Sequence, residues 1–203
     1  MARAEAAVRM AYGSVSASPT VHACITEKCY AALGGRGEMG KVFGQRILLS
    51  PRGLNWHFLA HEWSHAEMST RLTLFAWKRM PQWFDEGLAV VISEAPEHSE
   101  NHWQFLISTR IPRPSRDELL TYQSLQQWLA GVHRFGDDKN FERVAQGQPT
   151  LSPVYSDAGR EVRPWLAQVG SHGLLHVIQQ MNEGADFEAA YTPQTLSPST
   201  PTP

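Results

Sequence analysis

Hydrophobic side chains recur at three- and four-residue steps through the middle of the chain, which is the period of an amphipathic helix. One face of this predicted helix carries Leu54, Phe58, His61, His65 and Met68. The two histidines therefore lie in line with the apolar stripe. A second helical segment, 82–93, follows Pro81, a residue type that suits the first turn of a helix. The pattern predicts two consecutive helices here.

The strand-like patterns of the chain lie within the first fifty residues. Short runs at 21–25 and 45–49 predict two strands, and the glycine-rich stretch 33–40 between them predicts a turn. Later patterns are helical, apart from a polar loop predicted over 136–153. The predicted fold class is α+β, with a small N-terminal sheet packed on the histidine-bearing helix and a mainly helical C-terminal part.

Further helices are predicted at 2–12, 97–110, 117–129, 156–169, 172–182 and 186–191. Pro164 lies inside one of them and either kinks that helix or marks its true start. The last residues, 192–203, are rich in Pro, Ser and Thr, a composition that predicts disorder. Residues 1–191 are therefore expected to form a single domain.

The composition, 42% hydrophobic and 19% charged, is that of a soluble globular protein without a membrane span. Eighteen basic and twenty acidic residues leave a formal net charge of -2, so nothing in the totals indicates a nucleic-acid partner. The N-terminal stretch MARAEAAVRMAYG lacks the apolar core of a signal peptide. We expect a cytoplasmic protein if this N-terminus is native, and a periplasmic or secreted one if an export segment has been removed.

Cys24 and Cys29 are the two cysteines, too few for a disulfide scaffold or a cysteine-rich zinc site. Residues five apart on a strand point to opposite faces, which works against a disulfide between them. A turn near residues 26–28 would remove that objection. The sequence favours free thiols and leaves the pairing open.

The stretch LAHEWSHAEMS contains two histidines that bracket a glutamate as His-Glu-x-x-His. Residues four apart on a helix lie above one another, so the imidazoles of His61 and His65 can close on one ion of tetrahedral habit such as Zn²⁺. Glu62 stands beside that ion without ligating it and can take a proton from a metal-bound water. The alternative is that these are surface or hydrogen-bonded core histidines, and a third ligand would decide between the two.

Twenty-one positions after His65 stands Glu86, within the stretch PQWFDEGLAVVIS. Together with HEWSH, this stretch resembles the glutamate-zincin (gluzincin) metallopeptidases, and most closely the bacterial peptidase MA-like domains. The resemblance implies a zincin-like fold, one Zn²⁺ held by His61, His65 and Glu86, and a peptide or protein substrate. Asp85 takes the place usually held by Asn, and either orients His65 or is a cap or surface acid.

The resemblance covers roughly residues 44–191 and includes VYSDAGREVRPWLAQVG. In the wider clan a Tyr or His from this region hydrogen-bonds the oxyanion of the tetrahedral intermediate, and the matching position is Tyr155. The alternative for Tyr155 is a buried side chain at a helix start with its hydroxyl satisfied.

The other histidines are not expected to be ligands. His57 lies one turn before the motif and is expected to support the site or to pack. The pairs His98/His102 and His172/His176 repeat the four-residue step without a glutamate motif, and such pairs are usually solvated.

These observations predict a zinc-dependent metallopeptidase with Glu62 as general base and Tyr155 as oxyanion donor. The alternative is a catalytically silent zinc-scaffold protein with a binding or regulatory role. A nucleic-acid-associated protease built on the same motif is disfavoured by the near-neutral charge. The substrate sequence and the oligomeric state are left open.

Overall fold

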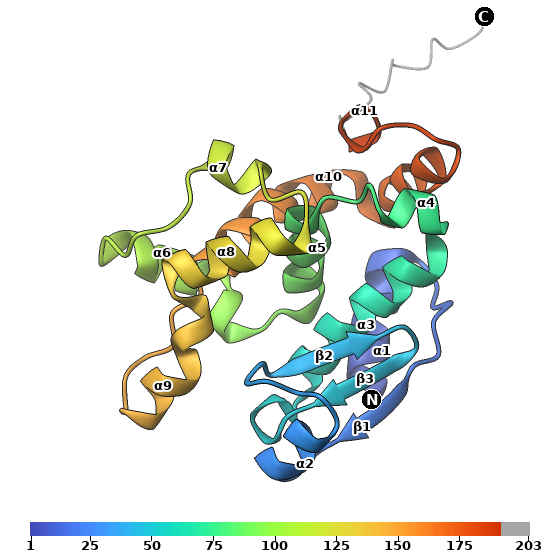
Figure 1. Ribbon diagram of the computed structural model, residues 1–203. Helices are drawn as coiled ribbons and strands as arrows, with labels where there is room; N and C mark the ends of the chain where they lie inside the picture. The colour runs from blue at the N-terminus through green and yellow to red at the C-terminus, as the bar shows by residue number, and fades with distance from the viewer. Residues whose placement is uncertain (192–203) are drawn as a thin grey trace, which may run out of the picture.

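The computed structural model describes residues 1–191 (Figure 1), so the predicted tail, 192–203, lies outside the described residues. The strands are β1 (Thr20–Ala23), β2 (Gly40–Phe43) and β3 (Arg46–Leu49). The helices are α1 (Ala2–Tyr12), α2 (Glu27–Ala32), α3 (Trp56–Arg71), α4 (Leu74–Trp77), α5 (Gln82–Ser93), α6 (Glu100–Ser108), α7 (Arg116–Leu120), α8 (Leu125–Phe135), α9 (Asn140–Ala145), α10 (Pro153–Asn182) and α11 (Phe187–Tyr191). Three short 3₁₀ turns join them: η1 (Pro51–Gly53), η2 (Pro96–His98) and η3 (Asp137–Lys139).

The three strands form one mixed sheet in the order β1-β3-β2. Val21 on parallel β1 and Val42 on antiparallel β2 both pair with Ile47 of the central strand β3. Strand β2 was not predicted from the sequence, which placed its first residue in a turn. Its residues are exposed or half-buried, so little hydrophobic pattern marks them, and pairing with β3 is what keeps them extended.

Helices α3, α5 and α10 build the core beside this sheet. Helix α3 lies against β2 and β3, and also packs on α1 and α5, while α5 packs on α10 (Figure 1). Large side chains such as Phe84 and Leu88 of α5 are fully buried between these layers. The predicted α+β class, with a small N-terminal sheet next to the histidine-bearing helix and a helical C-terminal part, is confirmed.

The predictions for residues 117–153 were wrong in detail. The single helix expected over 117–129 is two helices, because Ser124 starts α8 with a capping box that it forms with Gln127. The polar loop expected over 136–153 contains η3 and α9. Both differences arise from short helices that caps and tertiary contacts stabilise, whereas the hydrophobic period mainly reports long ones.

Helix α10 begins at Pro153 and spans 30 residues, so Pro164 is neither its start nor the position of a kink. The backbone departs from helical geometry at Gly170, with φ of 61° and ψ of -166°. This positive φ is one that glycine adopts readily. The two helices predicted at 156–169 and 172–182 therefore meet at Gly170. No helix within residues 1–191, α10 included, is long and apolar enough to cross a membrane.

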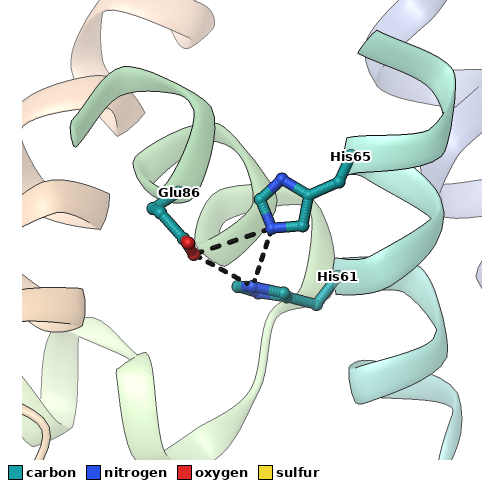
Figure 2. Close-up of side chains that lie close together, drawn as sticks. All are labelled: His61, His65 and Glu86. Carbon is teal, nitrogen blue, oxygen red and sulfur yellow. Dashed lines mark hydrogen bonds and ion pairs between the residues drawn. The ribbon is translucent and has the colours of Figure 1, made fainter. Parts of the chain in front are cut away.

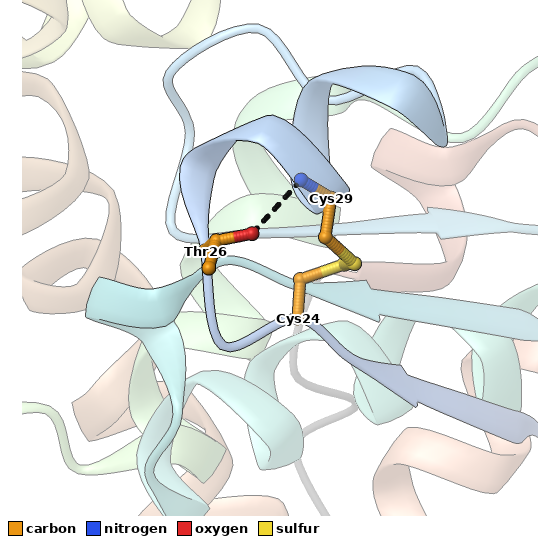
Figure 3. The surroundings of a disulfide bond; sticks show 3 residues. All are labelled: Cys24, Thr26 and Cys29. Atoms are coloured by element: carbon orange, nitrogen blue, oxygen red, sulfur yellow. Dashed lines mark hydrogen bonds between the residues drawn. A yellow bond between two sulfur atoms is a disulfide. The ribbon is translucent and has the colours of Figure 1, made fainter.

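Cys24 and Cys29 form a disulfide, with Cα atoms 5.6 Å apart, which corrects the expectation of free thiols (Figure 3). The chain leaves β1 after Ala23, and α2 begins only four residues later. The hydroxyl of Thr26 caps α2 by accepting a hydrogen bond from the backbone N–H of Cys29, at 3.1 Å. This turn brings Cys29 back beside Cys24, so the strand geometry that separates residues five apart does not apply.

Candidate metal centre

Helix α3 carries the His-Glu-x-x-His motif. Its N-terminus is capped by Asn55, whose side chain accepts a hydrogen bond from the backbone N–H of Phe58 at 3.1 Å. His61, Glu62 and His65 are each only 7–8% exposed. Polar side chains are costly to bury without partners, so three of them together on the inner face of a helix indicate a built site and not a solvated surface.

Helix α5 brings Glu86 to the two histidines. The start of α5 is fixed by the backbone N–H of Trp83, which donates to the carbonyl of Tyr122 at 3.0 Å. Its middle lies close to α10, where a Cβ added to Gly87 would stand 2.6 Å from the carbonyl oxygen of Ala158. Glycine at position 87 therefore permits the close approach that holds α5 and its neighbouring Glu86 in place.

Figure 2 shows Glu86 pointing from α5 toward His61 and His65 on α3. The Nε2 atoms of the two histidines are 3.2 Å apart. The Oε2 atom of Glu86 lies 3.3 Å from Nε2 of His61 and 3.6 Å from Nε2 of His65. Within residues 1–191, His61, His65 and Glu86 are the His, Cys, Asp or Glu side chains that lie close enough together to hold a metal ion.

These three distances match the spacing that a tetrahedral ion requires. With bonds of about 2.0–2.1 Å and tetrahedral angles, two ligand atoms of one ion lie about 3.3–3.4 Å apart. The observed range of 3.2 to 3.6 Å brackets that value. Oε2 of Glu86 is also buried without a hydrogen-bond partner among the described residues. The three side chains therefore fit one divalent cation without rearrangement.

Asp85 orients His65. Its Oδ2 lies 2.8 Å from Nδ1 of His65, and both side chains are buried. When Nδ1–H donates to the carboxylate, Nε2 is left as an acceptor that faces the cluster, which is how a metal-binding histidine is usually held. The alternatives considered for Asp85 do not hold, because a residue 4% exposed is not a surface acid and the start of α5 has no side-chain cap hydrogen bond.

The cluster is also coupled electrostatically. Burial alone would raise the pKa of Glu86, but the charge of His65 and the closeness of both histidines hold it well below its ordinary value. Burial alone would lower the pKa of His65, but the charges of Asp85 and Glu86 raise it well above its ordinary value. A divalent cation must compete with the proton on His65, so metal affinity should increase with pH.

Glu62 lies outside the ligand triangle, on the side of α3 that faces β2. Burial raises its pKa, against the opposing effect of His61 and His65. A Cβ added to Gly40 of β2 would lie 2.8 Å from Cγ and 3.0 Å from Oε1 of Glu62. Glycine at position 40 therefore leaves the space that this carboxylate occupies.

Tyr155 reaches the cluster from α10, with its ring centroid 6.2 Å from that of His61. The start of α10 is held by buried Asp137, whose Oδ1 accepts hydrogen bonds from the backbone N–H groups of Val154 and Tyr155, at 3.0 and 3.4 Å. Burial and the charge of Glu86 raise the pKa of Tyr155 well above its ordinary value. The structure thus brings a protonated phenol beside the candidate metal centre.

Three further histidines lie around the site. Nδ1 of His57 is 2.7 Å from the carbonyl oxygen of Ser93, a contact that ties α3 to the end of α5. Nε2 of His102 accepts a hydrogen bond from the backbone N–H just before α10. His98 was not assigned to the site from the sequence, but its ring stacks on Tyr155 at a centroid distance of 5.0 Å.

No protein-family model, no curated protein and no solved structure matches the chain. The resemblance to gluzincins therefore rests on the sequence alone, and its two specific motifs are those of the zinc-binding helices. The arrangement of His61, His65 and Glu86 is a separate observation, because it comes from distances between side chains. These three side chains can hold one divalent cation next to the buried carboxylate of Glu62, which is not needed as a ligand.

Proposed function

We propose that the chain is a zinc-dependent metallopeptidase of the gluzincin type with a zincin-like fold. The proposal is carried by the three ligand atoms, 3.2 to 3.6 Å apart on two helices, with Glu62 beside them. Two imidazole nitrogens and one carboxylate oxygen are a donor set of catalytic zinc sites, which keep a fourth position open. Zinc held in this way lowers the pKa of a bound water to about 7 and polarises a carbonyl group.

Glu62 is the proposed general base and then general acid. Its carboxylate takes a proton from the attacking water and passes it to the amine nitrogen as the C–N bond breaks. Burial raises the pKa of Glu62, which brings it nearer to neutral pH. A group that first accepts and then donates a proton works best when its pKa is near the operating pH.

Tyr155 is the proposed donor to the carbonyl oxygen of the scissile bond. Because burial raises the pKa of its hydroxyl, the phenol keeps its proton at neutral pH and can donate it in a hydrogen bond. A donor aimed at an oxygen that gains charge in the transition state contributes about 2.7–4 kcal/mol in comparable sites.

The sheet offers a place for an extended peptide. Strand β2 is an edge strand that pairs with β3 on one side, and its first residue, Gly40, is next to Glu62. An extended chain can add to such an edge through main-chain hydrogen bonds. A peptide bound along β2 would therefore pass close to the proposed general base, which supports a peptide or protein substrate.

The test is cleavage of a fluorogenic peptide library by the zinc-loaded protein. We expect the Glu62→Gln variant to bind zinc like the wild type and to lose about 10³-fold in rate, because it cannot accept the proton. Glu142→Gln, an exposed position on α9, is the matched control and should cleave like the wild type. Cleavage at the wild-type rate by Glu62→Gln would refute the mechanism, and zinc binding without any cleavage by the wild type would favour the silent scaffold.

A further inference from the structure

The chain between η3 and α10 is folded back on itself beside Tyr155. Asp137, in η3, accepts a hydrogen bond from the backbone N–H of Tyr155 at 3.4 Å. The side chain of Asn140 donates to the carbonyl of Leu151 and accepts from its backbone N–H, at 2.9 and 2.7 Å. Residues 137–152, which we call the α9 segment, are therefore fastened beside the start of α10.

The α9 segment reaches the other side of the site through Phe141. Cζ of Arg52, in η1, lies 4.8 Å from the centre of the Phe141 ring. The same guanidinium donates to the carbonyl of Gly37 at 2.7 Å, and its Nη1 lies 3.7 Å from Sδ of Met39, the residue before β2. Figure 1 shows α9 on the side of the sheet where β2 begins. The α9 segment therefore spans from the start of α10 to the start of β2.

The contact between Phe141 and Arg52 lies at the Gly40 end of the free edge of β2. Gly40 is next to Glu62, the proposed general base, and Gly37 comes three residues before it. Each residue of an extended chain covers about 3.3 Å. A peptide paired with β2 therefore has room for about three residues beyond Gly40 before it meets Arg52 and Phe141.

Core packing does not explain the position of α9. The helix has six residues, none of them buried, and Phe141 and Val144 are 51% and 52% exposed. So short a helix is not stable by itself. The hydrogen bonds beside α10 hold one side of the α9 segment, and the contact of Phe141 with Arg52 holds the other. Because a cation–π contact at the surface is weak, a single substitution can release that side.

The direction of strand pairing decides which end of a peptide is limited. Antiparallel pairs are slightly more stable per residue than parallel ones, and β2 already pairs in this way with β3. A peptide antiparallel to β2 runs from Phe43 toward Gly40. The part that continues past Gly40 is therefore C-terminal to the bond beside Glu62, and the N-terminal part lies along β2, away from the α9 segment.

We infer that the α9 segment makes the protein a peptidase of C-terminal chain ends, which releases fragments of up to about three residues. The inference rests on the proposed peptidase function. Phe141 and Arg52 take no part in the hydrolysis and act by excluding longer chains, which is a way to discriminate between substrates. The substrate is then an extended peptide whose C-terminus lies close to the bond that is cut.

The test locates the cuts that the zinc-loaded protein makes in a library of unstructured peptides, by mass spectrometry. We expect the wild type to cut within about three residues of the C-terminus. The best substrate is then lengthened by the same short polar sequence at either end. The C-terminal extension should lower the rate about 10-fold or more, and the N-terminal extension less than about twofold.

Two variants of α9 test whether Phe141 sets this limit. Phe141→Ala removes the contact with Arg52 and should recover most of the lost cleavage of the C-terminally extended peptide. Val144→Ala is the matched control, because it shortens an equally exposed apolar side chain of the same helix. It should discriminate between the two extended peptides like the wild type.

Each other outcome is decisive. Cuts spread evenly along the peptides, or equal rates for the two extended peptides, would overturn the inference while the peptidase proposal stands. Selective loss with the N-terminal extension would put the closed end on the wrong side and would also overturn it. So would a Phe141→Ala variant that discriminates like the wild type. If the zinc-loaded wild type cleaved no peptide at all, the proposed function would fall and the inference with it.

Discussion

Replacing Asp85 should weaken metal binding although Asp85 is not a ligand. Its carboxylate lies 2.8 Å from Nδ1 of His65, and both groups are buried. A hydrogen bond to a charged group contributes about 1.5–3 kcal/mol, and loss of such a supporting group usually weakens metal affinity about 10- to 100-fold. Asp85→Asn keeps an acceptor but loses the charge, so we expect about 10-fold. Asp85→Ala removes the acceptor, so we expect about 100-fold.

The measurement is competition for Zn²⁺ between the protein and a chromogenic chelator at neutral pH. The chain offers a matched control, because Asp138 makes the same 2.8 Å contact with Nδ1 of His133 on the surface. Asp138→Asn should leave the zinc affinity unchanged. If Asp85→Ala bound zinc within about threefold of the wild type, orientation of His65 by this carboxylate would contribute nothing, and the reasoning would be refuted.

Two further predictions concern stability. Replacing Cys24 and Cys29 by serine removes a cross-link over a sequence separation of 5. The loop entropy of the unfolded chain predicts that the free energy of unfolding falls by about 2 kcal/mol. Urea unfolding under oxidising conditions should show this loss, and equal midpoints for variant and wild type would contradict it. The pKa of His98 is about 3 in the fold and about 6.5 when unfolded, so the unfolded chain binds a proton that the folded one does not. The free energy of unfolding should therefore fall by about 1.4 kcal/mol per pH unit from pH 6.5 toward pH 3. Urea unfolding at several pH values should show a smaller pH dependence of stability for His98→Phe than for the wild type. The same pH dependence in both proteins would show that His98 is not its source.

The parts of the site that lie on single helices could be predicted from the sequence. The helical period places His61, Glu62 and His65 along one turn, and the second predicted helix has the bounds that the structure gives to α5. That Glu86 meets the two histidines was predicted from a motif, and the structure confirms that the three side chains are close enough to hold a metal ion. Local sequence suffices here because backbone geometry alone fixes the spacing within each helix.

The parts that depend on distant contacts could not be predicted. Strand β2 is extended because it pairs with β3, and the disulfide forms because α2 begins immediately after Thr26. His98 reaches the site because Glu94 adopts a left-handed conformation, which is rare outside glycine. Each of these depends on a turn or a pairing that leaves little trace in the hydrophobic pattern.

Zinc content is the measurement that tests the central claim most directly. We predict one zinc ion per chain in the purified wild type and loss of that zinc in Glu86→Ala, because two histidines alone leave the site without its third ligand. Glu142→Ala changes an exposed glutamate of α9 and should retain the ion. A wild-type protein that binds no zinc, or a Glu86→Ala variant that binds it as tightly as the wild type, would contradict the three-ligand metal centre.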